Sequence, residues 1–257
     1  MHRFYLPPDE CLKDPPRLSE RESHHALNVL RVRPRDRVVV LNGAGDELLC
    51  EVLNAERRAL TLRIVQKNAI PPLPYQVTLV QAVARGKAME LIVQKATELG
   101  AHRIVPILSE RTVAQVDAEA VPDKVEKWVA STVEALKQCG SAWLPRVEAP
   151  LTAQAFLARG DRFDLTFIAS LQNEARHPRE HFESFRSERE RSPESVCVWV
   201  GPEGDFTPAE INAVRAAGAL PITLGPLVLR SETAAIYSLS VINYELQSKR
   251  GQNGHLK

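Results

Sequence analysis

A strand, a tight turn and the start of a helix follow one another in residues 196–210, which read VCVWVGPEGDFTPAE. The apolar run Val196–Val200 predicts a buried strand. Thr207 has the position of a helix N-cap, Pro208 suits the first helical position, and Glu210 completes a capping box. In a parallel sheet such a turn lies at the carboxyl end of its strand, where ligands bind. We therefore expect an α/β fold with a ligand site at this turn.

The composition of this turn indicates the charge of its ligand. Gly201 and Gly204 have no side chain, so a ligand can approach the main chain closely. The turn carries Glu203 and Asp205 but no lysine, and neither phosphate-binding pattern, GxxxxGK(S/T) nor GxGxxG, occurs in the chain. Two carboxylates would repel a phosphate by roughly 1–4 kcal/mol per close contact. The turn favours a neutral or cationic ligand; the alternative is a plain connection between strand and helix.

A second turn of this kind lies at 224–234, with the sequence LGPLVLRSETA. It joins a short predicted strand, Pro221–Leu224, to a helix that begins near Ser231. Glu232 in the first helical turn complements the helix dipole, which is a sufficient structural reason for it, and Arg230 can pair with Glu232. Because two glycine-bearing turns with carboxylates occur in succession, we expect both to hold one ligand.

Strands and helices alternate through the C-terminal part of the chain, which predicts a mostly parallel sheet covered on both faces. Besides the strand and helices above, the predicted elements are strands Val77–Val83, Arg103–Leu108 and Phe163–Ala169, helix Lys87–Leu99 and a helix opened by Pro122. Pro106 places its strand at an edge or end of the sheet. The charged run Glu174–Glu194 has no apolar period and is interpreted as a solvated loop or surface segment.

The first seventy residues predict a small β domain. Apolar runs at 38–41 and 48–53 flank an Asn-Gly turn, which is a strong hairpin signal, and 60–65 alternates like a half-buried strand. Three prolines between Ile70 and Pro74 stiffen the chain and cannot donate to a sheet. We place the domain boundary there.

Composition excludes several classes of protein. The 257 residues are 44% hydrophobic and 25% charged, so the chain is not disordered, and no apolar run approaches the roughly 18 residues of a membrane span. Four cysteines without a C-x-x-C pair argue against a zinc ribbon or a disulfide framework. His2, His24 and His25 have no partners at metal-ligand spacing. We expect reduced thiols, no metal and a cytoplasmic location.

A formal net charge of +1 leaves no basic footprint over the whole chain, so nucleic-acid binding needs a local patch. Such a patch lies at 28–37, which holds four arginines against one aspartate. Contacts from all four to the phosphates of a single strand would give a salt slope of about −3. The alternative is a solvated strand edge blunted by charge.

Six separate stretches resemble one family in the same order. They are RFYLP at 3–7, His25 with VLR at 29–31, RGKAME at 85–90 with QKATELG at 94–100, Glu134 with QCG at 138–140, WVGPEGDF at 199–206 and LGPLVLRSETA at 224–234. Together they resemble the small-subunit (16S) rRNA uridine-N3 methyltransferase family of the SPOUT superfamily. The likeness covers nearly the whole chain.

The resemblance implies an N-terminal PUA-like β-barrel that binds RNA, residues 1–70, and a C-terminal SPOUT α/β methyltransferase domain with a trefoil knot, residues 74–250. It implies S-adenosylmethionine (SAM) as cofactor and methyl donor, and N3 of a specific uridine in 16S rRNA as acceptor. The expected partners are 16S rRNA or the small ribosomal subunit and a second copy of the chain, with an interface beside the cofactor pocket. Neither a membrane nor a metal is expected.

The resemblance also implies site residues. The cofactor-binding candidates are Leu171, Gly201, Pro202, Glu203, Gly204, Leu224, Gly225, Leu229, Thr233 and Ala234. Uridine N3 carries a proton, so methyl transfer is helped by a proton acceptor and by a cation beside the uracil oxygens. The catalytic candidates are Arg230 and Arg85 for the cation, and Glu232 and Glu134 for the proton. The RNA-binding candidates are Arg3, His25, Arg31, Arg33, Arg35 and Lys87.

The chain departs from the family pattern at three positions and in the loop after Ala169, which reads SLQNE at 170–174 where the family usually has a leucine–proline or proline–glutamate type. Asp205 stands where the family usually has a second glycine, and Leu227 and Ser141 stand where it usually has arginines. The missing arginines concern RNA contacts more than cofactor binding. Two alternatives stay open: a divergent paralogue that binds RNA without catalysis, and an α/β enzyme for a small molecule with the β domain as a lid.

Overall fold

The computed structural model of the protein describes residues 1–55, 59–111, 118–169 and 175–247. The chain divides into two compact units. Unit 1 contains Met1–Leu73 and Thr132–Leu144, and unit 2 contains Pro74–Ser131 and Pro145–Lys257. Each unit is held together by its own apolar core.

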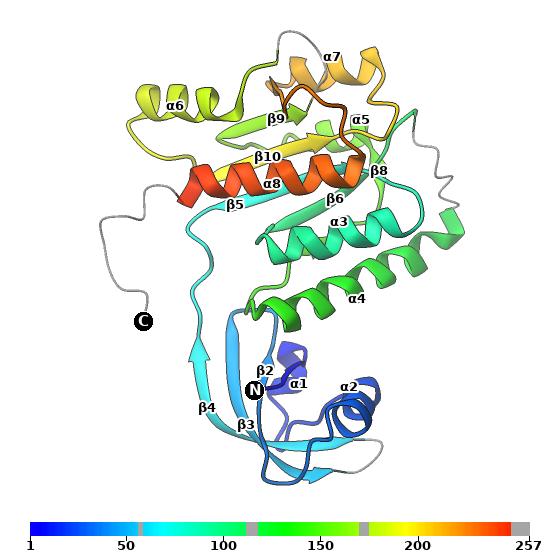
Figure 1. The fold of residues 1–257 in the computed structure, drawn as a ribbon, viewed down its shortest axis with the longest axis vertical. Coiled ribbons are helices and arrows are strands. Elements are labelled where there is room, and N and C mark those ends of the chain that lie inside the picture. The colour runs from blue at the N-terminus through cyan, green and yellow to red at the C-terminus, as the bar shows by residue number, and fades with distance from the viewer. Residues whose placement is uncertain (56–58, 112–117, 170–174, 248–257) are drawn as a thin grey trace. The chain divides into compact units, whose positions relative to one another are not determined.

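Unit 1 is built on a sheet whose strands β1 to β4 lie in chain order: Arg3–Tyr5, Arg37–Leu41, Asp46–Ala55 and Leu60–Ala69. β1 is parallel to β2. β2, β3 and β4 are successively antiparallel (Figure 1). The predicted hairpin and third strand are therefore confirmed. Asn42 shapes the hairpin turn, because its side-chain oxygen accepts hydrogen bonds from the amides of Ala44 and Asp46.

The core of unit 1 comes from alternating apolar side chains of these strands, such as Val38, Cys50 and Leu62. Short helices close it: α1 (Pro8–Cys11), α2 (Glu20–His24) and the π-helical turn η1 (His25–Val29). Ala26 of η1 is fully buried in this core.

Unit 2 is built on a sheet in the order β11-β9-β10-β5-β6-β7, with β8 paired to β6. Its strands are β5 (Gln76–Ala82), β6 (Arg103–Leu108), β7 (Arg146–Val147), β8 (Leu151–Thr152), β9 (Leu165–Ala169), β10 (Ser195–Val200) and β11 (Leu220–Ile222). All of these pairings are parallel, so the predicted parallel sheet is confirmed. The order brings the carboxyl ends of β9, β10 and β11 to neighbouring positions.

Helices cover both faces of this sheet. They are α3 (Lys87–Glu98), α4 (Val121–Cys139), α5 (Ala153–Leu157), α6 (Pro178–Arg189), α7 (Pro208–Ala216) and α8 (Ser231–Gln247), with a 3₁₀ turn η2 at Ala118–Ala120. α3 and α8 pack side by side on one face (Figure 1). Val198 of β10 lies in the core under these helices, whereas its neighbour Trp199 lies in the core under α5 and α7. No helix in the described part of the chain is long and apolar enough to cross a membrane.

Pro106 lies inside the sheet, so the expectation that it marks an edge or end is wrong. On one side of β6, Pro106 is opposite Gln81 of β5. On the other side, β7 pairs with the first two residues of β6 and β8 with the last two. The neighbouring strand is therefore interrupted opposite Pro106, where a residue without an amide hydrogen breaks no ladder.

The charged segment Glu174–Glu194 contains helix α6, so its interpretation as a loop is wrong, whereas the alternative of a surface segment is confirmed because most of the helix is exposed. His177 and Glu180 form a capping box at the start of the helix. Phe182 and Phe185, which lie on one helix face, are buried against the sheet. Two aromatic residues among many charges form an apolar period that is too weak to predict a helix from the sequence. Their buried surface is nevertheless large enough to keep the helix packed on the sheet.

Candidate active site

A cavity of about 460 Å³ lies at the carboxyl ends of β9, β10 and β11 in unit 2. Ala169 ends β9, Val200 ends β10 and Thr223 follows β11, and all three line the cavity. The other lining residues come from the two glycine turns, the start of α8 and one further loop position: Gly201, Pro202, Glu203, Asp205, Leu224, Gly225, Pro226, Leu227, Val228, Leu229, Ser231, Ala234 and Ala175. The two turns therefore lie against one cavity.

Asp205 gives the first turn its shape. Its φ of 60° falls in the left-handed region, which glycine enters most easily and aspartate tolerates better than most side chains. The amide of Asp205 donates to the carbonyl of Pro202 at 2.9 Å, and its Oδ1 accepts from the amide of Phe206 at 2.7 Å. An aspartate can therefore adopt this left-handed conformation in the turn, and it adds a negative charge to the cavity wall.

A buried carboxylate fastens this turn to the loop after β6. Oε2 of Glu210 accepts from the hydroxyl of Ser109 at 3.0 Å and from the amide of Thr207 at 2.9 Å. Oε1 of Glu210 accepts from the amide of Glu110 at 3.1 Å. The capping box predicted for α7 is confirmed, and its carboxylate also makes a long-range contact.

The second turn depends on a glycine. Gly225 has a φ of 108°, which is strained for any residue with a side chain. Its amide donates to the hydroxyl of Thr223 at 3.2 Å. Leu227 and Val228 follow with exposed fractions of 73% and 77%. The turn thus exposes two apolar side chains at the cavity.

Two hydrogen bonds join the turns to each other and to the sheet. Ser231, the first residue of α8, is buried, and its hydroxyl donates to the carbonyl of Gly201 at 2.8 Å. The same hydroxyl accepts from Nε2 of Gln81 at 2.9 Å. Gln81 lies at the carboxyl end of β5 and is fully buried. The cavity wall is therefore tied to the strand beside β10.

The charges of the cavity favour a cation. Among the described residues, the charged side chains that line it are the carboxylates of Glu203 and Asp205, and no lysine or arginine does so. The N-terminus of α8, beginning at Ser231, adds a positive dipole end that suits a carboxylate group. No group of three or more His, Cys, Asp or Glu side chains in the described ranges could hold a metal ion. The arrangement suits an organic ligand with a cation and a carboxylate.

Comparisons with known proteins identify the family. Residues 71–243 match the family model of an RNA methyltransferase domain, and residues 18–65 match that of an RNA methyltransferase PUA domain. The ribosomal RNA small subunit methyltransferase E of Bacillus subtilis is 30% identical over 235 residues, which cover 91% of each chain. That of Mycobacterium bovis is 31% identical over 221 residues, covering 86% of this chain and 83% of the relative. The chain belongs to the ribosomal RNA small subunit methyltransferase E family.

Solved structures agree with this membership of the methyltransferase E family. A Legionella pneumophila protein in complex with the bound cofactor SAM is 29% identical, with a TM-score of 0.82 over 96% of each chain. A ribosomal RNA small subunit methyltransferase E from Neisseria gonorrhoeae, bound to S-adenosyl methionine, is 25% identical, with a TM-score of 0.80 over 96% of this chain and 97% of that one. The predicted family resemblance is confirmed, as is an α/β fold with an N-terminal PUA-like domain and a C-terminal methyltransferase domain.

Most of the residues that the sequence predicted to bind the cofactor line the cavity: Gly201, Pro202, Glu203, Leu224, Gly225, Leu229 and Ala234. Gly204 and Thr233 are exposed and do not line it. The carbonyl of Gly204 accepts a hydrogen bond from the guanidinium of Arg111 at 2.9 Å. Leu171 lies outside the described residues.

The catalytic candidates lie at three places. Arg230 is exposed and Glu232 is half-buried, and they flank the cavity-lining Ser231 in the chain; the structure has no ion pair between these two described side chains. Arg85 is exposed in the loop between β5 and α3, where its carbonyl accepts from the amide of Ala88. Arg230 and Glu232 are thus the sequence neighbours of a residue that lines the cavity.

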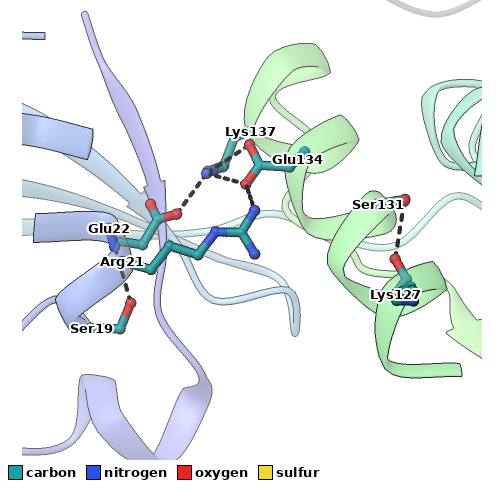
Figure 2. A network of polar contacts seen from close by, with 7 residues as sticks. All are labelled: Ser19, Arg21, Glu22, Lys127, Ser131, Glu134 and Lys137. Carbon is teal, nitrogen blue, oxygen red and sulfur yellow. Dashed lines mark hydrogen bonds and ion pairs between the residues drawn. The ribbon is translucent and has the colours of Figure 1, made fainter. Parts of the chain in front are cut away.

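Glu134 belongs to an ion-pair network of unit 1. Figure 2 shows its carboxylate between Arg21 and Lys137; Oε1 accepts from Arg21 at 3.2 Å and from Lys137 at 3.0 Å. Lys137 also binds Glu22 at 2.6 Å, and the side chains of this second pair are only 10% and 9% exposed. Glu134 is therefore already paired with two cations, and it does not line the cavity.

The RNA-binding candidates Arg31, Arg33 and Arg35 are exposed in the loop before β2. They lie outside any strand, so the alternative of a strand edge is wrong for these three arginines. Arg31 and Arg35 have φ values of 56° and 75°, and the amide of Arg35 donates to the carbonyl of Val52 at 2.8 Å. None of the three arginines forms an ion pair with a described carboxylate.

The other RNA-binding candidates have different surroundings. The guanidinium of Arg3 donates to the carbonyl of Gln138 at 3.3 Å and lies against Gly140, where a Cβ would be 2.9 Å from Cζ of Arg3. His25 is exposed at the start of η1 in unit 1. Lys87 is the exposed first residue of α3 in unit 2.

Sequence reasoning missed Gln81, Ser109 and Arg111. Gln81 had a usable signal, since an amide inside the mostly apolar run 77–83 is unusual for a buried strand. Ser109 and Arg111 had none, because their partners in the glycine turn region are 101 and 93 residues away.

Proposed function

We propose that the protein binds S-adenosylmethionine in this cavity and transfers its methyl group to N3 of a uridine in 16S rRNA. The observation that carries the proposal is the single cavity between two glycine turns, with Glu203 and Asp205 as its charged lining side chains among the described residues. Membership of the methyltransferase E family supports it, as does the Neisseria gonorrhoeae relative bound to S-adenosyl methionine.

The residues present fit this cofactor. The cavity volume of about 460 Å³ is in the usual range of small-molecule sites, roughly 300–1,000 Å³. Glu203 and Asp205 suit its sulfonium and ammonium groups, and the N-terminus of α8 suits its carboxylate. Leu224 and Leu229 offer apolar contact to a purine ring. When bound, the cofactor supplies a methyl group on a cationic sulfur.

The chain itself has to manage the N3 proton. We assign Glu232 as the proton acceptor and Arg230 as the cation that stabilises negative charge on the uracil oxygens, with Arg85 as a second cation. Glu232 is preferred to Glu134, because the Glu134 carboxylate is paired with Arg21 and Lys137.

RNA recognition is assigned to residues 1–70, and methyl transfer to residues 74–250. The arginines at 31, 33 and 35 would contact phosphates, with further contacts from Arg3, His25 and Lys87; the exposure of the loop arginines without ion pairs supports this. N3 lies on the Watson–Crick edge, so the target uridine has to be unpaired or flipped out, at a cost of a few kcal/mol.

The finer features of the family follow as part of the same proposal. They are a closed PUA-like barrel, a trefoil knot, a homodimer and a cytoplasmic location. Exposed Leu227, Val228 and Tyr244 on the second turn and α8 support a dimer interface there. Four free cysteines are compatible with a reducing compartment.

Titration calorimetry with S-adenosylmethionine and a methylation assay on small ribosomal subunits and naked 16S rRNA test the proposal. We expect cofactor binding, methyl incorporation, and N3-methyluridine at one position by mass spectrometry. A folded protein that does not bind the cofactor would exclude the enzyme. RNA binding that does not depend on the cofactor, together with no methyl transfer, would favour a non-catalytic RNA-binding paralogue. In that case Glu232→Ala should leave RNA affinity unchanged.

A further inference from the structure

Gln81 is a buried polar residue that does not itself line the cavity. Its Nε2 donates to the hydroxyl of Ser231 and to the carbonyl of Ala82, both at 2.9 Å. Its Oε1 is buried and has no hydrogen-bond partner among the described residues. An unpaired buried acceptor lowers stability, so stability alone does not explain a glutamine at this position.

Ser231 connects Gln81 to the cavity wall. Its hydroxyl has a single hydrogen, which it donates to the carbonyl of Gly201 at 2.8 Å. The oxygen is then oriented to accept the amide hydrogen of Gln81. The relay therefore runs in one direction, from Gln81 through Ser231 to Gly201, and its last two members line the cavity.

We infer that Gln81 is a positioning residue for the cofactor site: through Ser231 it fixes the separation of the two glycine turns before the cofactor binds. This inference rests on the proposed function, because it takes the cavity as the cofactor site. Without the amide of Gln81, the hydroxyl of Ser231 keeps only one of its two described partners and can rotate away from Gly201. The two turns then have to be ordered by the ligand, which weakens binding.

The test uses the full-length protein and three variants. Gln81→Met keeps the length of the side chain but removes its amide, including the unpaired oxygen. Ser231→Ala removes the middle of the relay. Ser238→Ala is the matched control, since Ser238 is also fully buried on α8 and its hydroxyl has no partner among the described residues. S-adenosylmethionine is the probe for calorimetry, and a 16S rRNA fragment is the probe for RNA affinity.

Gln81→Met and Ser231→Ala are each expected to raise the Kd for S-adenosylmethionine roughly tenfold, equal to about 1.4 kcal/mol or one net hydrogen bond. RNA affinity should be unchanged, and the Tm of Gln81→Met should stay near that of the wild type, because the variant loses two hydrogen bonds but also removes the unpaired buried oxygen. The double variant should bind no more weakly than either single variant, because both break one relay. Ser238→Ala should bind like the wild type.

Each contrary result has a distinct meaning. Wild-type protein that does not bind the cofactor overturns the proposed function, and this inference with it. Wild-type binding combined with Gln81→Met and Ser231→Ala that behave like Ser238→Ala overturns the positioning role alone. A lower Tm for Gln81→Met without loss of cofactor affinity, or fully additive losses in the double variant, would also overturn it. If Gln81→Met does not fold, Ser231→Ala against Ser238→Ala decides the question.

Discussion

Ser109 and Glu210 lie 101 residues apart in sequence, and the hydroxyl of Ser109 donates a hydrogen bond to the carboxylate of Glu210 at 3.0 Å. The same carboxylate accepts from the amide of Thr207 and closes the capping box of α7. One side chain therefore starts a helix and fastens the first glycine turn to the loop after β6. A signal that is local in sequence thus has a tertiary role in the structure.

Glu210→Ala is expected to lower the free energy of unfolding by about 2–3 kcal/mol, because it removes a helix cap and leaves buried donors without an acceptor. Glu180→Ala provides the comparison: it removes the capping-box carboxylate of α6, which is exposed, and should cost below about 1 kcal/mol. Urea denaturation followed by circular dichroism measures both. Equal losses of unfolding free energy in the two variants would contradict the stabilising role of the buried Glu210 carboxylate.

Glu203→Lys tests the charge of the cavity. It is expected to weaken binding of S-adenosylmethionine roughly tenfold at low salt, because it replaces an attraction to the sulfonium with a repulsion. Binding of S-adenosylhomocysteine, which has a neutral sulfur, should weaken less. Calorimetry with both ligands measures the difference, and Glu90→Lys, an exposed change on α3, is the control. Equal losses for the two ligands would argue against a sulfonium near Glu203.

Acid stability should depend on Asp164. Hydrogen bonds from Arg191, at 2.6 and 3.1 Å, and from the amides of Glu194 and Ser195 lower the pKa of Asp164 from 3.8 to about 2. A lowered carboxyl pKa gives stability that is present above pH 3.8 and is lost as the pH falls through about 2. Arg191 is half-exposed, so Asp164→Asn should cost only about 1 kcal/mol at pH 7.

Urea denaturation of the wild type and Asp164→Asn between pH 7 and pH 2 measures this contribution. The difference in unfolding free energy should be constant down to about pH 4 and should shrink below it, as the wild-type carboxylate becomes protonated. A difference that stays the same at pH 2 would show that the variant acts through packing and not through the charge of Asp164.

The loop before β2 should supply much of the salt dependence of RNA binding. Replacing Arg31, Arg33 and Arg35 by glutamine is expected to reduce the slope of log Kd against log salt by about 2, at roughly 0.7 per phosphate contact. Fluorescence anisotropy with a 16S rRNA fragment at several salt concentrations measures the slope. Arg63→Gln is the control, because Arg63 is already paired with Glu51 at 2.8 Å. An unchanged slope in the triple variant would remove this loop from the RNA interface.

Sequence patterns predicted those parts of the structure whose determinants are close together in the chain. The capping box of Thr207 and Glu210, the hairpin at Asn42 and the parallel strands are all local signals, and all three are present. The sequence also predicted that the two glycine turns lie together, because the carboxyl ends of neighbouring parallel strands meet at one edge of a sheet. Both turns line one cavity in the structure.

Features that depend on remote partners could not be predicted. The place of Pro106 is explained by the gap between β7 and β8, which belongs to another part of the chain. The ion pairs of Glu134 involve Arg21, which is 113 residues away. The relay from Gln81 to Ser231 spans 150 residues. In each case the side chain was visible in the sequence, but its partner was not.

Unit 1 includes Thr132–Leu144, which follow α3, β6 and the first part of α4 in the chain. Trp143 from this segment covers Gly45, where a Cβ would lie 2.5 Å from the indole, and its ring N–H donates to the carbonyl of Ile70 at 2.9 Å. During synthesis on the ribosome, the N-terminal strands therefore emerge before Trp143, and the packing of unit 1 is completed only after residue 143 has been added. A protein fragment ending at Leu73 lacks Trp143, so Gly45 and the carbonyl of Ile70 stay without this partner. A truncated form of this enzyme that is meant to preserve the N-terminal strands should therefore also contain residues 132–144.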